Sequence, residues 1–256
     1  MIYTSKIQKA IKFSIKTHEV YQKQKRKGKD IPYIVHPLTT GIILASVKAS
    51  EDVIIAGILH DTIEDSIPEK KVTKKMLIER FGKKVADLVE SVTEKNKELP
   101  WEERKKEVLM HIKNFSHDLL LIKSADIISN ATELIEDFEK NGDETFSRFN
   151  APKEKTILNY LKLIRTIIEC WADNPLAKDL IFIAKQLQMI GNAFFMSSYP
   201  EIVIEYKNYN KNKELECPLC GWHGKTHPNI ESDLVIDVTC PICDKILLVA
   251  NFSFCY

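Results

Sequence analysis

Apolar residues recur at helical spacing from the N-terminus to about residue 196, and this pattern constrains the fold more than any other feature. Ile7, Ala10, Ile11 and Ile15 form the first such stripe. Strict alternation of apolar and polar residues is rare in this region, which argues against strands. The pattern indicates roughly nine helices, and it predicts a mainly α fold built as a helical array.

Capping residues and helix breakers place the ends of several of these helices. Thr73 and Ser116 are candidate N-caps, Pro37 suits a first helical turn, and Gly82 separates two short apolar stripes. The apolar run that ends in LHDTIED is expected to form one continuous helix over Asp52–Asp65. These signals predict short helices joined by tight connections.

The composition changes near residue 200, where a second unit is expected to begin. Residues 199–216 are polar and rich in Tyr, Asn and Lys, and short β-like apolar runs follow them. A module of about 45 residues is too small to be stable through its hydrophobic core alone, so it needs a disulfide or a bound metal. We therefore predict a helical domain over residues 1–198, a linker over 199–214 and a small β module over 215–256.

Four cysteines in this module are candidates for such a stabilising site. Cys217 and Cys220 form one CPxC pair, and Cys240 and Cys243 form another after 19 intervening residues. Two such pairs at this spacing are typical of a four-cysteine structural zinc ribbon. The alternative, two redox-active CxxC pairs, is disfavoured because no βαβ pattern surrounds them. The ribbon is also a candidate binding site for a macromolecular partner.

The charge balance and the hydropathy pattern exclude several classes of protein. The formal net charge is +1, from 37 basic and 36 acidic residues, which argues against bulk attraction to nucleic acid or membranes. No apolar run approaches the roughly 20 residues that cross a bilayer. Lysines interrupt the N-terminal helix, so it lacks the apolar core of a secretory signal. We expect a cytoplasmic protein with no membrane partner.

Polar side chains interrupt otherwise apolar helices at three widely separated places. His36 begins one helix, His60 and Asp61 lie in the C-terminal part of another, and Asp126 lies on a third. Burying such groups is costly unless they are paired or bind a metal. Two imidazoles with two carboxylates suit Mn²⁺, Fe²⁺ or Zn²⁺ better than Ca²⁺. A single His-Asp pair would be weak evidence, but the combination favours a metal site.

Further polar residues accompany these candidate ligands. Glu64 and Asp65 lie one turn beyond the His-Asp pair, where they can orient or deprotonate a water molecule. Lys123 and Asn130 share one helix face with Asp126, at spacings of three and four residues. They are placed to meet the anionic and polar parts of a substrate.

The order of these motifs resembles the HD-domain hydrolases of the RelA/SpoT type, including the small stand-alone alarmone hydrolases. The motifs are KRKGKDIPYIVHP, LHDTIED, SVTEKNKELPWEERK and KSADIISNA, and the resemblance spans residues 1 to about 170. The implied activity is hydrolysis of the 3′-pyrophosphate of guanosine tetra- or pentaphosphate, which leaves GDP or GTP and pyrophosphate. The implied roles are one divalent ion, usually Mn²⁺, held by His36, His60, Asp61 and Asp126, a catalytic acidic pair of Glu64 and Asp65, and a nucleotide pocket of Arg26, Lys27, Tyr33, Lys123 and Asn130.

Two other functions stay open at this point. One is an HD phosphatase or phosphodiesterase that acts on another phosphorylated nucleotide or cofactor, since Ile127 and Ile128 replace the large basic or aromatic residues often found after the aspartate. The other is a non-catalytic nucleotide sensor whose ribbon engages a macromolecule. Retention of every implied ligand and of both acidic residues favours an enzyme. The oligomeric state is left open, and an oligomer is possible.

Overall fold

The computed structural model describes residues 3–94, 96, 98–195, 202–205, 208–218, 220–225, 230–231, 235–242 and 245–251. Helices form the whole of the described structure up to residue 195 apart from loops and one isolated bridge between Lys25 and Pro32, so the mainly α prediction is confirmed. The α-helices are α1 Ser5–Ile15, α2 Val35–Ser46, α3 Glu51–Leu59, α4 Thr62–Asp65, α5 Lys74–Phe81, α6 Lys83–Val92, α7 Trp101–Ile112, α8 His117–Asn141, α9 Lys153–Cys170 and α10 Ala177–Phe195. A π-helical segment, η1, spans Lys16–Tyr21, and 3₁₀ segments span Pro68–Lys70 (η2) and Gly142–Arg148 (η3).

The predicted helix ends occur where the capping signals place them. The Thr73 hydroxyl accepts a hydrogen bond from the backbone N–H of Met76, and Ser116 accepts one from Leu119. Gly82 has a φ of +92°, a conformation that favours glycine, and it separates α5 from α6. These local signals are reliable because each involves residues within one turn of the helix end.

The continuous helix predicted over Asp52–Asp65 is wrong, because the chain breaks between α3 and α4. The Thr62 hydroxyl donates to the carbonyl of Leu59 at 2.6 Å, and His60 Nδ1 lies 2.7 Å from the carbonyl of Gly57. Side-chain bonds of this kind compete with the backbone ladder of a helix. Asp61 accordingly adopts φ −92° and ψ −5°, away from ideal helical values.

Glycines allow α2 and α3 to approach closely. A Cβ on Gly41 would lie only 2.6 Å from Cγ1 of Ile58, and a Cβ on Gly57 would overlap the side chain of Leu44. Leu44 and Ile58 are themselves buried. The side chains of Ile58 and Leu44 therefore lie against the backbone of the facing helix, which brings the start of α2 toward the end of α3.

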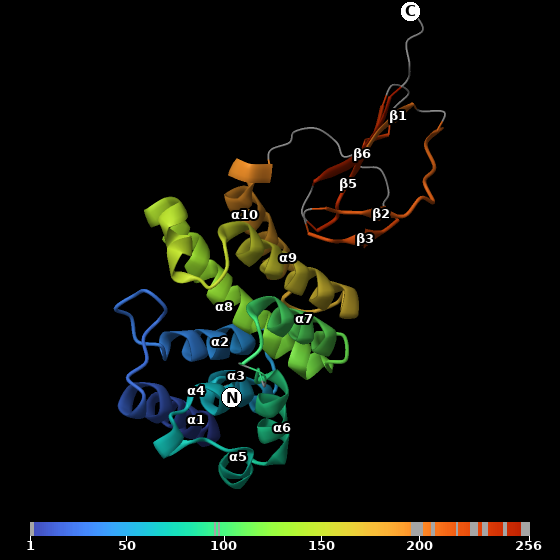
Figure 1. Ribbon diagram of the computed structural model, residues 1–256. Helices are drawn as coiled ribbons and strands as arrows, with labels where there is room; N and C mark the ends of the chain where they lie inside the picture. Colours follow the sequence, from blue (N-terminus) through green and yellow to red (C-terminus); the bar gives the residue numbers. More distant parts are fainter. Residues whose placement is uncertain are drawn as a thin grey trace, which may run out of the picture.

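The long helix α8 runs through the middle of the helical domain and serves both of its cores (Figure 1). Leu121, Ile122 and Ala125 face the core formed with α1, α3, α5 and α6. Ile127 and Leu134 face the second core, formed with α9 and α10. The polar stripe of α8 lies between these apolar faces and meets α2 and the α3–α4 break.

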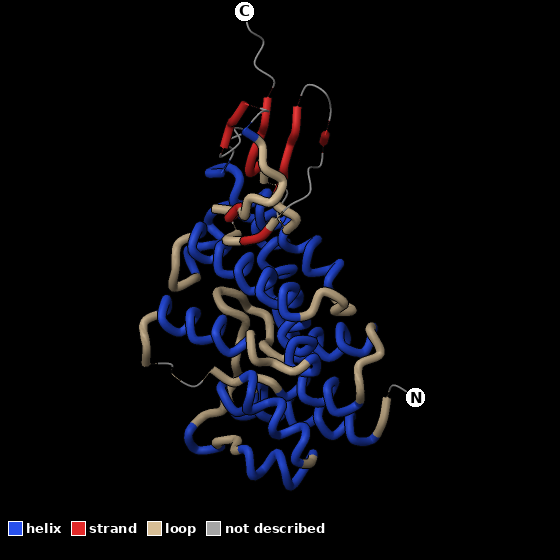
Figure 2. The backbone as a smooth tube through the Cα atoms, turned by 90° about the vertical axis from the view of Figure 1, so that its right-hand side faces the viewer, coloured by secondary structure: helices blue, strands red, loops and turns tan. Residues whose placement is uncertain are grey.

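The C-terminal strands gather at one end of the helical domain (Figure 2). They are β1 Ile202–Glu205, β2 Leu215–Glu216, β3 His223–Gly224, β4 Ile230–Glu231, β5 Val235–Thr239 and β6 Ile246–Asn251. One sheet has the order β1-β6-β5-β4, in which β1 runs parallel to β6 and the other pairs are antiparallel, while β2 and β3 form a separate antiparallel pair.

This module shares a core with the helical domain. Leu215, Trp222 and Leu248 belong to the same buried cluster as Leu161 and Leu187 of α9 and α10. The strand β1 falls within the segment expected to be a linker and pairs with the module. No helix within the described ranges is long and apolar enough to cross a membrane.

Candidate metal and nucleotide site

Two buried imidazoles face each other where α2 meets the α3–α4 break. His36 Nε2 and His60 Nε2 are 3.1 Å apart, and both side chains are almost fully buried. The opposite ring nitrogens are held in place, His36 Nδ1 by Ser129 Oγ at 2.9 Å and His60 Nδ1 by the Gly57 carbonyl at 2.7 Å. Partners of this kind orient metal-binding histidines. Both Nε2 atoms therefore point at one place.

Two carboxylates reach the same place. Asp61 Oδ2 lies 3.0 Å from His60 Nε2 and 3.6 Å from His36 Nε2. Asp126 Oδ1, from α8, lies 3.4 Å from His36 Nε2 and 3.9 Å from His60 Nε2. The four residues predicted as ligands are therefore brought together from two helices, α2 and α8, and the break between α3 and α4.

The donor set fits one divalent ion. Two nitrogens that each bind an ion at about 2.1 Å lie roughly 2.9–3.4 Å apart in octahedral or tetrahedral geometry. The separation of 3.1 Å between His36 and His60 falls in this range. Donor atoms of these two residues and of Asp126 all lie within 4.8 Å of one another. Imidazole nitrogens combined with carboxylate oxygens suit Mn²⁺, Fe²⁺ or Zn²⁺.

The electrostatics at this point favour positive charge. Burial alone would lower the pKa of His60, but the neighbouring carboxylate of Asp61 outweighs it and raises that pKa to about 9. Burial lowers the pKa of His36. Burial would raise the pKa of Asp126, yet Lys123 and the two histidines hold it well below its usual range. The carboxylates stay ionised and can bind a cation.

Donors from the nucleotide-binding candidates surround the carboxylates. Tyr33 donates its hydroxyl proton to Asp61 Oδ2 at 2.6 Å. Lys123 Nζ and Asn130 Nδ2 donate to the two oxygens of Asp126 at 2.7 and 2.6 Å. Arg26 Nη2 in turn donates to Asn130 Oδ1 at 2.7 Å. Each ligand carboxylate is thus held by at least one further residue.

The acidic pair lies beside the ligands, on α4. Glu64 Oε2 accepts a hydrogen bond from the backbone N–H of Glu94 at 3.1 Å. Asp65 Oδ2 accepts one from Gln24 Nε2 at 2.9 Å. The backbone N–H of Asp65 also donates to the carbonyl of Asp61 at 2.8 Å, which ties the pair to the metal-site turn.

Two adjoining cavities open beside the polar face of α8, and one of them reaches Asp126. One has a volume of about 260 Å³, and Lys105, Lys123 and Asp126 are among its lining residues. The other has a volume of about 420 Å³, and Arg26 and Arg148 are among its lining residues. The lining residues common to both are Lys27, Asn130, Phe149 and Tyr160. Cationic side chains with aromatic rings between them suit a phosphorylated nucleoside.

Several residues of this site were missed by sequence reasoning. Gln24 and Ser129 contact Asp65 and His36 across 41 and 93 residues of sequence. Tyr160 lines both cavities from α9, and burial raises its pKa to about 12. No local sequence pattern marks such single contacts.

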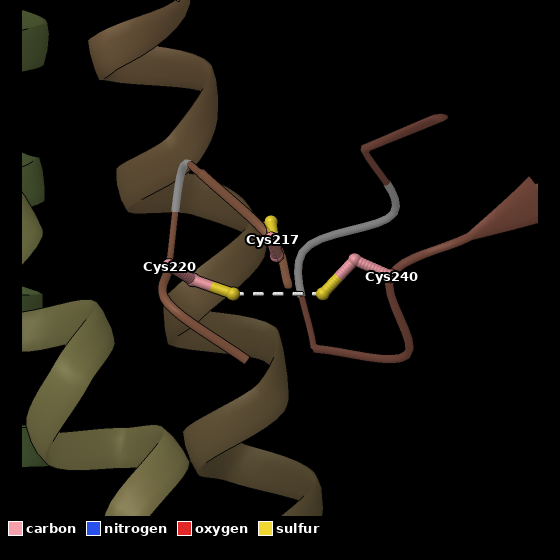
Figure 3. Close-up of side chains that lie close together, drawn as sticks. All are labelled: Cys217, Cys220 and Cys240. Atoms are coloured by element: carbon pink, nitrogen blue, oxygen red, sulfur yellow. Dashed lines mark hydrogen bonds between the residues drawn. The ribbon is translucent and has the colours of Figure 1, made fainter. Parts of the chain in front are cut away.

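Three cysteines form a second cluster in the C-terminal module (Figure 3). Cys217, Cys220 and Cys240 are fully buried, and a ligand atom of each lies within 4.8 Å of the others. The sulfur atoms of Cys220 and Cys240 are 3.5 Å apart, close to the roughly 3.8 Å expected for thiolates around one zinc ion. Gly221, with φ +71°, turns the first CPxC pair back on itself. Cys243, the fourth predicted ligand, lies outside the described residues.

Comparison with known proteins identifies relatives of the helical domain. The model of the HD domain family matches residues 10–151. The guanosine-3′,5′-bis(diphosphate) 3′-pyrophosphohydrolase MESH1 of Danio rerio is 33% identical over 133 residues, which are 51% of this chain and 70% of that protein. The GTP pyrophosphokinase of Myxococcus xanthus is 45% identical over 91 residues, which are 36% of this chain but only 11% of that protein.

Solved structures show the same fold. A metazoan SpoT ortholog, described as hydrolysing ppGpp, superposes with a TM-score of 0.56 at 21% identity over 75% of this chain and 96% of its own. The protein lmo0812 of Listeria monocytogenes EGD-e superposes with a TM-score of 0.55 at 27% identity over 61% of this chain and 99% of its own. The chain therefore belongs to the HD domain family. The predicted resemblance to the RelA/SpoT type is confirmed for the helical domain.

Proposed function

We propose that the chain hydrolyses the 3′-pyrophosphate of guanosine tetra- or pentaphosphate and releases pyrophosphate, leaving GDP or GTP. The observation that carries this proposal is the meeting of His36, His60 and Asp126 at one buried point beside a cationic cavity. The names of the relatives support the choice of substrate. Besides the Danio rerio protein, an Aquifex aeolicus protein named as the same hydrolase is 42% identical over 91 residues, which are 12% of its length.

The metal ion of this reaction would be Mn²⁺, with Fe²⁺ or Zn²⁺ as alternatives. His36, His60, Asp61 and Asp126 would hold it, with one oxygen of Asp61 also bonded to Tyr33. When bound, a divalent ion acidifies water beside it and neutralises charge on a phosphoryl oxygen. The hydrogen bonds to Ser129 and Gly57 keep both imidazoles oriented for that task.

The residues around this ion divide the remaining work. The oxygen of the attacking water bonds to the phosphorus next to the ribose. Glu64 or Asp65 takes the proton that this water loses. The bond from that phosphorus to O3′ breaks, and O3′ receives a proton. Lys123 and Lys27 neutralise the phosphate oxygens. Arg26, Tyr33 and Asn130 line the adjoining cavity, where they would contact the nucleotide.

The two cavities accommodate the two ends of the substrate. The cavity that includes Asp126 would take the 3′-diphosphate, since Arg104, Lys105 and Lys123 supply positive charge there. The adjoining cavity, with Arg148, would take the rest of the nucleotide. Phe149 and Tyr160 offer aromatic surface at the junction.

The C-terminal module would be a zinc ribbon, with Cys217, Cys220, Cys240 and Cys243 as ligands of a structural Zn²⁺. The support is the buried cluster of three thiols at zinc-like spacing. Three further points are predictions from the sequence. They are the division into residues 1–198, 199–214 and 215–256, a cytoplasmic location, and a macromolecular partner for the ribbon.

The test is a turnover assay with purified protein. Guanosine tetraphosphate and MnCl₂ are supplied, and pyrophosphate and free phosphate are measured separately, alongside a panel of other phosphorylated nucleotides. We expect stoichiometric GDP and pyrophosphate, and no turnover by Asp61→Ala. Absence of pyrophosphate release would refute this substrate. Turnover of another nucleotide would identify the alternative phosphohydrolase, and tight binding without turnover would identify a sensor.

A further inference from the structure

A buried histidine lies behind the acidic pair, outside the proposed ligand set. His18 is fully buried in η1, and it contacts Gln24 twice. The Gln24 backbone N–H donates to the His18 carbonyl at 2.9 Å, and His18 Nδ1 lies 2.9 Å from Gln24 Oε1. Because the amide oxygen only accepts hydrogen bonds, Nδ1 carries the proton in this pair. His18 Nδ1–H therefore holds the oxygen end of the Gln24 amide.

The other end of the same amide meets Asp65. Gln24 Nε2 donates to Asp65 Oδ2 at 2.9 Å. Turning the amide over would place Nε2 against a donor and Oε1 against a carboxylate, so both hydrogen bonds would be lost together. The Gln24 carbonyl also accepts from the backbone N–H of Tyr33 at 2.9 Å, which fixes the loop on its other side.

The same histidine also supports a donor to the metal site. Its ring packs against the ring of Tyr33 at a centroid distance of 5.1 Å, and the Tyr33 hydroxyl donates to Asp61. The buried imidazole of His18 thus contacts two hydrogen-bond donors, Gln24 and Tyr33. These residues donate to Asp65 and Asp61, respectively. The π-helical turn places it there, as π-helical segments often occur at functional sites.

We propose that Gln24 is a positioning residue for the Asp65 carboxylate and that His18 is the anchor that orients Gln24. The inference rests on the proposed function, in which Asp65 belongs to the pair that handles the proton of the attacking water. A displacement of about 1 Å at a reacting group can cost on the order of 100-fold in rate. A purely structural role would instead show as lost stability or weaker substrate binding.

Matched variants separate these roles in the guanosine tetraphosphate assay. Gln24→Leu removes both hydrogen bonds, and Gln24→Glu keeps the acceptor for His18 but loses the donor to Asp65. We expect both to lower kcat by about 10- to 100-fold, with KM and the Kd for Mn²⁺ changed less than about threefold. The control is Gln22→Leu, two residues away, which should stay within twofold of wild type.

A second pair of variants tests the anchor. Asn can place an amide N–H near the position of Nδ1, so His18→Asn should retain most of kcat. His18→Phe fills the same space without a donor and should lose as much kcat as Gln24→Leu. Equal activity of the two His18 variants would overturn the anchoring role.

Crystal structures of wild type and Gln24→Glu give a readout that does not need turnover. We expect the Asp65 carboxylate to rotate while His36 and Asp126 keep their positions. An unmoved Asp65 would overturn the proposal, as would Gln24 variants with kcat within twofold of wild type. If wild type releases no pyrophosphate, the substrate assignment fails, and the orientation of Asp65 in these structures still decides the positioning role.

Discussion

The variant Gly41→Ala tests whether the close contact of α2 and α3 sets the spacing of the two imidazoles. The new Cβ would lie 2.6 Å from Cγ1 of Ile58, about 0.8 Å closer than the 3.4 Å at which ordinary van der Waals contact begins. Ile58 is buried, and its β-branched side chain has one favoured rotamer in a helix. The clash between the new Cβ and Ile58 can therefore be removed only if the two helices separate.

The expected cost follows from two opposing terms. Overpacking a core costs about 1–3 kcal/mol, and replacing glycine by alanine within a helix returns about 1 kcal/mol. We expect a net loss of about 1 kcal/mol in the free energy of unfolding, measured by urea denaturation with circular dichroism. If the helices separate by a distance similar to this overlap, the distance between His36 Nε2 and His60 Nε2 increases from 3.1 Å. Mn²⁺ affinity, measured by calorimetry, should fall by about tenfold or more.

The partner variant Ile58→Ala makes the argument specific to this contact. Alone it should cost about 2–5 kcal/mol through the cavity that it leaves. Combined with Gly41→Ala, the loss should be smaller than the sum by about 1 kcal/mol or more, because the new methyl group enters that cavity. Additive energies, or a Gly41→Ala protein with wild-type stability and wild-type Mn²⁺ affinity, would refute the reasoning.

Three further outcomes are expected. Asp126→Asn should lower kcat by at least about 100-fold and weaken Mn²⁺ binding, whereas Glu136→Gln, on the exposed face of α8, should change neither. Burial would raise the pKa of Glu133, but Lys29 and Arg26 outweigh it and hold this pKa below its usual value. Because the unfolded chain then binds protons first as the pH falls, the stability from this carboxylate is present above the ordinary pKa of a glutamate and is lost as the pH falls through the lowered pKa of the folded state. Glu133→Gln should flatten this acid dependence in melting curves. Cys217→Ser should abolish zinc binding and make the C-terminal module sensitive to protease, and unchanged zinc content would contradict the ribbon.

Features set by neighbouring residues could be predicted from the sequence. Lys123, Asp126 and Asn130 share one face of α8 because the helical period places them there, and the structure links all three by hydrogen bonds. The N-caps at Thr73 and Ser116 are equally local. The period of a helix is enough to derive such arrangements.

Features set by tertiary contacts could not be derived in this way. The residue types favoured a metal site that includes His36 and His60, and the family resemblance implied the ligand set, because spacing alone does not show that α2 and α3 touch. The break at His60–Asp61 was missed, since it depends on side-chain bonds to the carbonyls of Gly57 and Leu59. Gln24 was missed because a single hydrogen bond across 41 residues leaves no periodic signal.

The most direct test of the central claim is anomalous X-ray diffraction at the manganese absorption edge, from crystals grown with Mn²⁺. One divalent ion held by His36, His60, Asp61 and Asp126 predicts a single strong peak about 2.1 Å from both Nε2 atoms, with carboxylate oxygens of both aspartates bound to it. No peak between these side chains, or a peak bound elsewhere in the helical domain, would contradict the account.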